Sequence, residues 1–101
     1  MAHKVLVAEA AQVAIAEACS YIDRVLREPS AAVALLDEFD EFVDAVADFP
    51  GLYPLCQERR LAAKGVRKAL VCGYVALYVC DEDEVDIIAF FHQTQDYARL
   101  L

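Results

Sequence analysis

The part of the sequence that could most directly do chemistry is its final stretch, FFHQTQDYARLL, from Phe90 to Leu101. His92 stands where an apolar run gives way to polar residues, and amides, a carboxylate and a tyrosine follow it. An unperturbed imidazole has a pKa of about 6.5, so it can accept or donate a proton near neutral pH. The same pattern is typical of a strand end, where a histidine is hydrogen-bonded to a backbone carbonyl or to a neighbour such as Asp96. The choice between these interpretations depends on which residues the fold places beside His92.

Charge is distributed unevenly along the chain. Six carboxylates with no cation lie between Asp37 and Asp48, and a second acidic run extends from Asp81 to Asp86. The net charge of −8 argues against a general nucleic-acid-binding protein, because phosphate contacts require lysine and arginine. Five of the nine cations nevertheless lie within one segment that contains no carboxylate: Arg59, Arg60, Lys64, Arg67 and Lys68. This basic segment is a candidate binding site, whereas the acidic run 37–48 is typical of a solvated helix face.

The length and composition of the chain limit the protein classes to which it could belong. With 101 residues it is expected to form one domain, residues 1–101, and 59% hydrophobic residues with 26% charged residues are typical of a globular protein. The longest apolar stretch, Ala69 to Cys80, is shorter than the roughly 20 residues that span a bilayer. The N-terminal residues MAHKVLVAEAAQ lack the pattern of a secretory signal, so we expect a cytoplasmic protein.

The cysteines do not indicate a metal site. No pair has the C-x-x-C spacing of a zinc or redox motif, and each has apolar neighbours. Buried, reduced thiols are therefore expected at Cys19, Cys56, Cys72 and Cys80, with no metal and no cofactor.

Two helices are expected in the N-terminal half, after a short strand from His3 to Val7. Apolar residues recur at helical spacing from about Glu9 to Arg27 and again from about Ser30 to Asp48, on either side of Glu28-Pro29. The expected buried stripe of the first helix comprises Ile15, Ala18, Cys19, Ile22, Val25 and Leu26. That of the second comprises Val33, Leu36, Phe39, Val43 and Val46, widened by Leu35 and Phe42. The short connection favours an antiparallel helical hairpin.

The second half of the chain is rich in short β-forming segments. FPGLYP, residues 49–54, breaks the chain, and Arg59 to Lys64 is expected to be a loop. Strands are expected at 66–71, 74–80 and 85–91, with a turn at Cys72-Gly73, a polar loop at 81–84 and a final turn at 96–101.

Strict alternation assigns the faces of the last two strands. One face of the strand 74–80 is expected to comprise Tyr74, Ala76, Tyr78 and Cys80. One face of the strand 85–91 is expected to comprise Val85, Ile87, Ala89 and Phe91. The order β-α-α-β-β-β predicts an α+β domain in which the helical hairpin packs on a small antiparallel sheet.

In this order, the segments resemble the RelE/ParE toxin superfamily, the small toxins of type II toxin–antitoxin modules, also called plasmid stabilisation proteins. The resemblance covers nearly the whole chain and includes the hairpin, FPGLYP, GVRKALVCGYVALYV and the acidic loop. Its most specific parts are Gly65-x-Arg67-Lys68 leading into Gly73-Tyr74-x-x-x-Tyr78, and His92-x-x-Gln95-Asp96-Tyr97.

The resemblance implies two alternative targets and one partner. RelE-like members are mRNA interferases that cut mRNA on the ribosome without a metal, ParE-like members poison DNA gyrase, and a cognate antitoxin neutralises both. Without the antitoxin, exposed apolar surface would favour self-association into a homodimer.

Metal-free RNA cleavage would require a base, an acid and cations that stabilise the phosphorane. The candidate catalytic residues are His92, Arg67, Lys68, Tyr78, Gln95 and Tyr97, and the candidate RNA- or target-binding residues are Arg59, Arg60 and Lys64.

The chain departs from the ribonuclease pattern at two places. RelE-like ribonucleases typically have an arginine where Val75 stands, and another in the segment occupied by Gln93-Thr94-Gln95. Each missing guanidinium could cost on the order of 100-fold in rate, by analogy with the loss of an oxyanion donor. The alternative is therefore a family member without catalysis that acts only as a protein-binding module. Such modules often bind a helix or an added strand of their partner.

Overall fold

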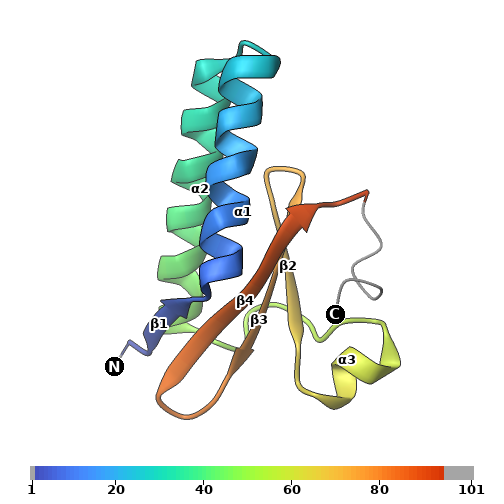
Figure 1. The fold of residues 1–101 in the computed structure, drawn as a ribbon. Helices are drawn as coiled ribbons and strands as arrows, with labels where there is room; N and C mark the ends of the chain where they lie inside the picture. Colours follow the sequence, from blue (N-terminus) through green and yellow to red (C-terminus); the bar gives the residue numbers. More distant parts are fainter. Residues whose placement is uncertain (1, 95–101) are drawn as a thin grey trace.

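The structure, a computed structural model, describes residues 2–94, so Gln95 and Tyr97 lie outside the described residues. The elements follow in the order β1 (Lys4–Val7), α1 (Glu9–Ser20), the π-helix η1 (Tyr21–Val25), α2 (Pro29–Asp48), α3 (Arg59–Ala63), β2 (Arg67–Val71), β3 (Tyr74–Cys80) and β4 (Glu84–His92). The predicted α+β class and the order β-α-α-β-β-β are confirmed, with one additional short helix (Figure 1). That helix, α3, corrects the expectation of a loop from Arg59 to Lys64, and Glu58 caps its N-terminus by accepting the Leu61 N–H.

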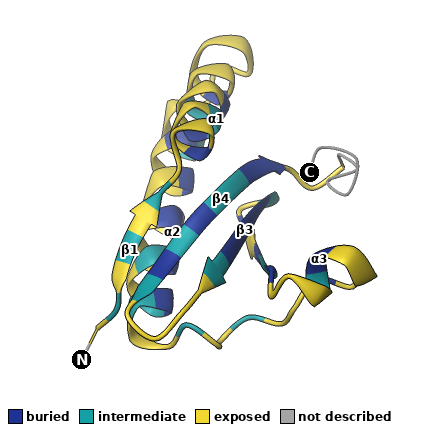
Figure 2. Ribbon diagram, turned by 60° about the horizontal axis from the view of Figure 1, so that its bottom comes forward, coloured by how far each residue is buried: buried dark blue, intermediate teal, exposed yellow. Residues whose placement is uncertain are grey.

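The four strands form one sheet in the order β1-β4-β3-β2. The expected antiparallel pairing holds for β2 with β3 and for β3 with β4, whereas β1 pairs parallel to β4 and makes the sheet mixed. The parallel pair arises because the helical hairpin carries the chain across the sheet before the β2-β3-β4 meander begins. The hairpin covers one face of the sheet, and α3 lies at the other face (Figures 1 and 2).

The helical hairpin extends beyond the sheet (Figure 1). The first helix was expected to continue to Arg27, but α1 ends at Ser20 and continues as η1, with the Leu26 N–H bonded to the Tyr21 carbonyl. Val25 and Leu26 are exposed, contrary to the expected stripe, because no strand lies beneath this tip. Arg27 then reverses the chain at a φ of 56°, and Pro29 begins α2.

The buried stripe of α2 follows a heptad-like spacing. Its fully covered residues are Ala32, Leu35, Phe39, Phe42 and Val46. Val33 and Leu36, expected in this stripe, are instead 57% and 45% exposed. Val33 and Leu36 lie beside the buried stripe of α2, which faces both α1 and the sheet, and no part of residues 2–94 covers them.

The sheet separates two apolar cores. Tyr78 and Ala76 share one face of β3 as predicted, and this face packs against the hairpin, whereas Val75 and Leu77 face α3, where Leu61 covers them. The strict alternation expected for 85–91 is wrong, because a β-bulge between Leu77/Tyr78 and β4 shifts the register. The result in β4 is that Val85, Ile87 and Phe90 contribute to the hairpin-side core, and Ile88, Ala89 and Phe91 pack in the core under α3.

The predicted turn at Cys72-Gly73 is confirmed. Both residues have positive φ, 50° and 80°, as a two-residue hairpin turn requires. The expected burial of all four cysteines is wrong for two of them: Cys72 is exposed because it lies in this turn, and Cys80 is exposed at the far end of β3. Cys56 is buried and Cys19 is partly buried. All four are free thiols in the structure.

Phe42 is the aromatic residue that joins α2 to the sheet, and its removal should destabilise the fold. Its ring contacts Phe39, Tyr53 and Tyr78 at centroid distances of 5.9, 5.6 and 5.8 Å. Phe42→Ala should lower the free energy of unfolding by about 3–5 kcal/mol in urea denaturation, through lost burial and the cavity left behind. The exposed Val33→Ala control should change it by less than about 0.5 kcal/mol. Equal effects of the two substitutions would contradict this packing.

Candidate functional site

His92 lies at the exposed end of β4, opposite Tyr74. Its Nδ1 is 2.8 Å from the Thr94 hydroxyl and accepts a 3.3 Å hydrogen bond from the Thr94 N–H. Within the described residues Thr94 is therefore its partner, in place of the expected backbone carbonyl, and Asp96, the other expected partner, lies outside the described residues. Because Nδ1 accepts a backbone N–H, the neutral ring carries its proton on Nε2.

Tyr74, which was not among the predicted site residues, lies beside His92. The Tyr74 ring meets the imidazole at 5.3 Å in an edge-on arrangement and stacks on Phe90 at 5.2 Å. Burial raises the pKa of Tyr74, so its hydroxyl stays protonated near neutral pH. The two-residue turn at Cys72-Gly73 was the signal that could have placed Tyr74 at this end of the sheet.

Arg67 lies at the opposite end of the sheet from His92. It pairs with Tyr78 across β2 and β3, whereas the pair at the other end of this hairpin is Val71 with Tyr74, and Tyr74 faces His92. Four residues along a strand span about 13 Å, and crossing from β2 to β4 adds roughly 10 Å. The predicted cation and the predicted base are therefore not brought together.

The side chain of Arg67 has a structural contact instead. Its guanidinium donates a 2.7 Å hydrogen bond to the Tyr53 carbonyl and so ties the segment after α2 to the edge of the sheet. Lys68 pairs with Leu77 and lies on the other face of the strand, where its charge opposes the burial that raises the pKa of Cys56. Its N–H donates to the Pro54 carbonyl at 3.0 Å, which adds a second tie to the same segment.

Tyr78 is enclosed in the core. Its side chain is 0% exposed, and its hydroxyl donates a 2.7 Å hydrogen bond to the Pro50 carbonyl. Burial, the largest cause, raises the pKa of this phenol. A residue in this position can support the segment 50–54, but a macromolecular substrate cannot reach it in this structure.

The three predicted target-binding residues lie on and beside α3. Arg59, Arg60 and Lys64 are exposed. The Arg60 guanidinium is 3.9 Å from the Glu58 carboxylate, a weak surface contact. The basic segment is thus divided. Three of its cations lie at the surface around α3, whereas the Arg67 guanidinium and the Lys68 backbone N–H, both on β2, hold the backbone of residues 53 and 54.

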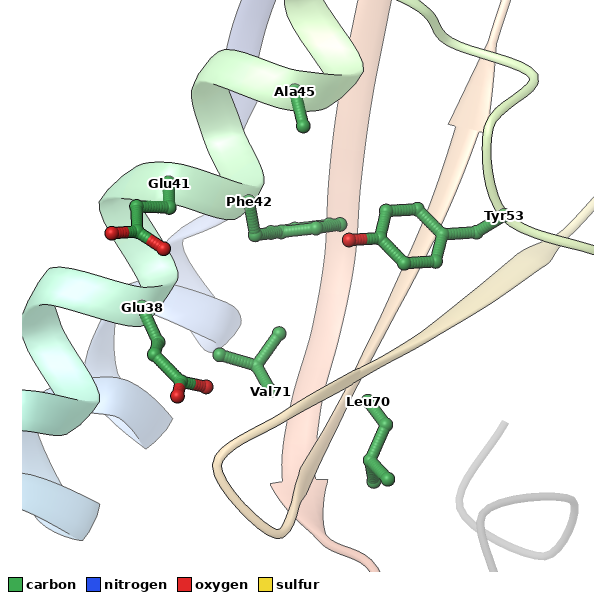
Figure 3. A pocket seen from close by; sticks show the side chains of 7 residues that line it. All are labelled: Glu38, Glu41, Phe42, Ala45, Tyr53, Leu70 and Val71. Atoms are coloured by element: carbon green, nitrogen blue, oxygen red, sulfur yellow. The ribbon is translucent and has the colours of Figure 1, made fainter.

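An acidic pocket between α2 and β2 was not anticipated from the sequence. It encloses about 290 Å³, and its walls are formed by Glu38, Glu41, Phe42, Ala45, Tyr53, Leu70 and Val71 (Figure 3). The spacing of 38, 41, 42 and 45 on one helix face was the available signal, but it did not reveal which strand lies opposite. A second hollow, of about 330 Å³, lies along the hairpin and is lined by Cys19, Ser20, Asp23, Arg24, Pro29, Ala32, Val33 and Leu36.

The family model for the ParE toxin of the type II toxin–antitoxin system parDE matches residues 5–97. This chain belongs to the ParE toxin family. The expected membership of the RelE/ParE superfamily is thereby confirmed, and with it the type II toxin class. A solved chain of the chromosomal ParDE TA system from P. aeruginosa has the same fold, with a TM-score of 0.70 and 14% sequence identity over 89% of this chain and 95% of that chain. No curated protein matches the sequence.

The described residues of this ParE family member form neither a metal-ligand group nor a membrane-spanning helix. Within residues 2–94, His, Cys, Asp and Glu side chains form no group that could hold a metal ion. No helix in that same part of the chain is both long and apolar enough to cross a membrane.

The two classes of cation in this ParE family member should respond differently to mutation. Arg67→Met should lower the free energy of unfolding by about 1–2 kcal/mol, because the Tyr53 carbonyl loses a charged donor. Lys64→Met, at an exposed site, should change it by less than about 0.5 kcal/mol. Urea denaturation measures both variants, and a stability of Arg67→Met equal to wild type would show that the contact is not structural.

Proposed function

We propose that this ParE family toxin inhibits growth by binding a protein target, DNA gyrase, and not by cutting mRNA. The observation that carries the proposal is the strand register, which separates His92 from Arg67 and Tyr78. Charge stabilisation of a phosphorane requires cations within hydrogen-bond reach of the reacting phosphate, together with a base. The family match to ParE toxins supports the same choice.

The surroundings of His92 support binding more than catalysis. The imidazole contacts Thr94 and Tyr74, and neither residue carries a positive charge. Gln93, the first residue of the segment in which ribonucleases typically have an arginine, bonds through its backbone N–H to the Gly73 carbonyl. Val75, at the other departure, is buried under α3 and offers no charge. The exposed cations that remain, around α3, suit recognition of an acidic protein surface.

A cognate antitoxin is the second part of the proposal. The hairpin exposes large apolar side chains at Tyr21, Val25, Leu26, Val33 and Leu36. Apolar surface of this kind is typical of a protein interface, and an amphipathic helix is a common occupant. In the absence of the antitoxin, the same surface would promote self-association. The toxin, its antitoxin and its target would all act in the cytoplasm.

The role of His92 distinguishes binding from catalysis. On induction without the antitoxin, wild type and His92→Ala should arrest growth equally, because the exposed imidazole performs no bond cleavage in the proposed mechanism. Transcripts should stay intact and DNA breaks should accumulate, as measured by mapping of RNA 5′ ends and by gel analysis of chromosomal DNA. Gln93→Ala, also exposed at this strand end, serves as the matched control, with protein levels compared by immunoblot.

Two other outcomes would overturn the proposal. Loss of growth arrest in His92→Ala alone, together with cut mRNA in wild type, would identify a ribonuclease. Absence of arrest in every variant would leave a protein-binding module without toxic activity.

A further inference from the structure

The acidic pocket has the shape of a site for one long side chain. In Figure 3 the carboxylates of Glu38 and Glu41 lie on the helix side, and the rings of Phe42 and Tyr53 meet across the pocket. The two rings are 5.6 Å apart at an angle of 61°, so an edge meets a face. The enclosed volume of about 290 Å³ is at the low end of small-molecule sites, which run from roughly 300 to 1,000 Å³.

The two carboxylates retain free acceptor capacity. Glu38 accepts a 3.1 Å hydrogen bond from the Cys72 N–H through one oxygen, which fixes the side chain at the rim beside the β2–β3 turn. Glu41 forms no ion pair with any cation among residues 2–94. The described lining contains no lysine, arginine or histidine, and the Arg67 guanidinium nearby donates to the Tyr53 carbonyl.

The remaining walls are apolar and aromatic. Val71 and Ala45 line the pocket next to the rings of Phe42 and Tyr53, and Leu70 is 60% exposed at its border. Lysine and arginine place an aliphatic stem on such a surface while the charged head reaches polar groups beyond it. An aromatic face adds attraction to the cation. The pocket thus combines the two environments that a long cationic side chain prefers.

We propose that this pocket binds a lysine or arginine side chain of the antitoxin, a refinement that rests on the proposed toxin–antitoxin function. Charge complementarity selects this occupant, because the toxin carries a net charge of −8 and Glu38 and Glu41 place two carboxylates at the wall of the pocket. The segment of the antitoxin that covers α2 and the edge of β2 is accordingly basic, with an apolar residue against Leu70. Its cationic head sits between Glu38 and Glu41, and its stem lies on Phe42 and Tyr53.

The test is calorimetric titration of the purified toxin with the protein encoded by the adjacent gene, at 50 and 300 mM NaCl. Glu38→Gln/Glu41→Gln should weaken binding at least about tenfold at low salt and should flatten the salt dependence. Asp40→Asn/Asp44→Asn carries the same change in net charge on the same helix outside the pocket, and it should weaken binding less than about threefold. Glutamine at 38 keeps an acceptor for the Cys72 N–H, and thermal denaturation checks that all forms are folded.

Charge reversal supplies an independent measurement. Glu38→Lys/Glu41→Lys should abolish binding of the antitoxin, and substitution of a single lysine or arginine of the antitoxin by glutamate should restore it. Equal effects of the two neutral double variants, or rescue at no antitoxin position, would overturn the proposal while leaving the toxin–antitoxin function intact. Absence of any binding by wild type would overturn both. If the pocket variants reduced self-association of the toxin instead, the occupant would be a second copy, and the proposal would be wrong.

Discussion

The pairing of β3 with both of its neighbours is the constraint on which the rest of the structure depends. Positive φ at Cys72 and Gly73 closes a two-residue turn, and this turn fixes the register of β2 against β3. The register then places Tyr74 beside His92 at one end of the sheet, and Tyr78 beside Arg67 at the other. The candidate catalytic residues are therefore divided: His92 lies at one end of the sheet, and Arg67 and Tyr78 lie at the other.

At the Arg67 end, two candidate catalytic groups hold the segment after α2 in place. The Tyr78 hydroxyl holds the Pro50 carbonyl and the Arg67 guanidinium holds the Tyr53 carbonyl, so the segment after α2 is fixed against the sheet. This segment positions the Tyr53 ring opposite Phe42 and completes the acidic pocket. Interior hydrogen bonds of this kind cost free energy when they are left unmade, so they stabilise this segment against the sheet.

Periodic features of the fold could be predicted from the sequence, and single-residue irregularities could not. The two helices and the faces of β3 follow from spacing that repeats over many residues, and the Cys72-Gly73 turn follows from a glycine between two β-forming segments. The β4 bulge inserts one residue without a compositional signal, so the alternation expected for 85–91 failed. Val33 and Leu36 have helical spacing, yet they are exposed because the seam of α2 follows 32, 35, 39, 42 and 46 instead. For the site, the position of His92 at a strand end could be predicted, but its distance from Arg67 depends on the register.

The mechanism we propose is that this ParE family member acts on DNA gyrase while the gyrase has DNA bound to it. The most direct measurement is the fate of supercoiled plasmid incubated with purified toxin, DNA gyrase and ATP, followed by detergent and protease. The account predicts linear DNA that appears only when toxin and gyrase are both present and disappears when the antitoxin is added. Plasmid that stays unbroken, while the same toxin preparation cuts mRNA on translating ribosomes, would contradict it.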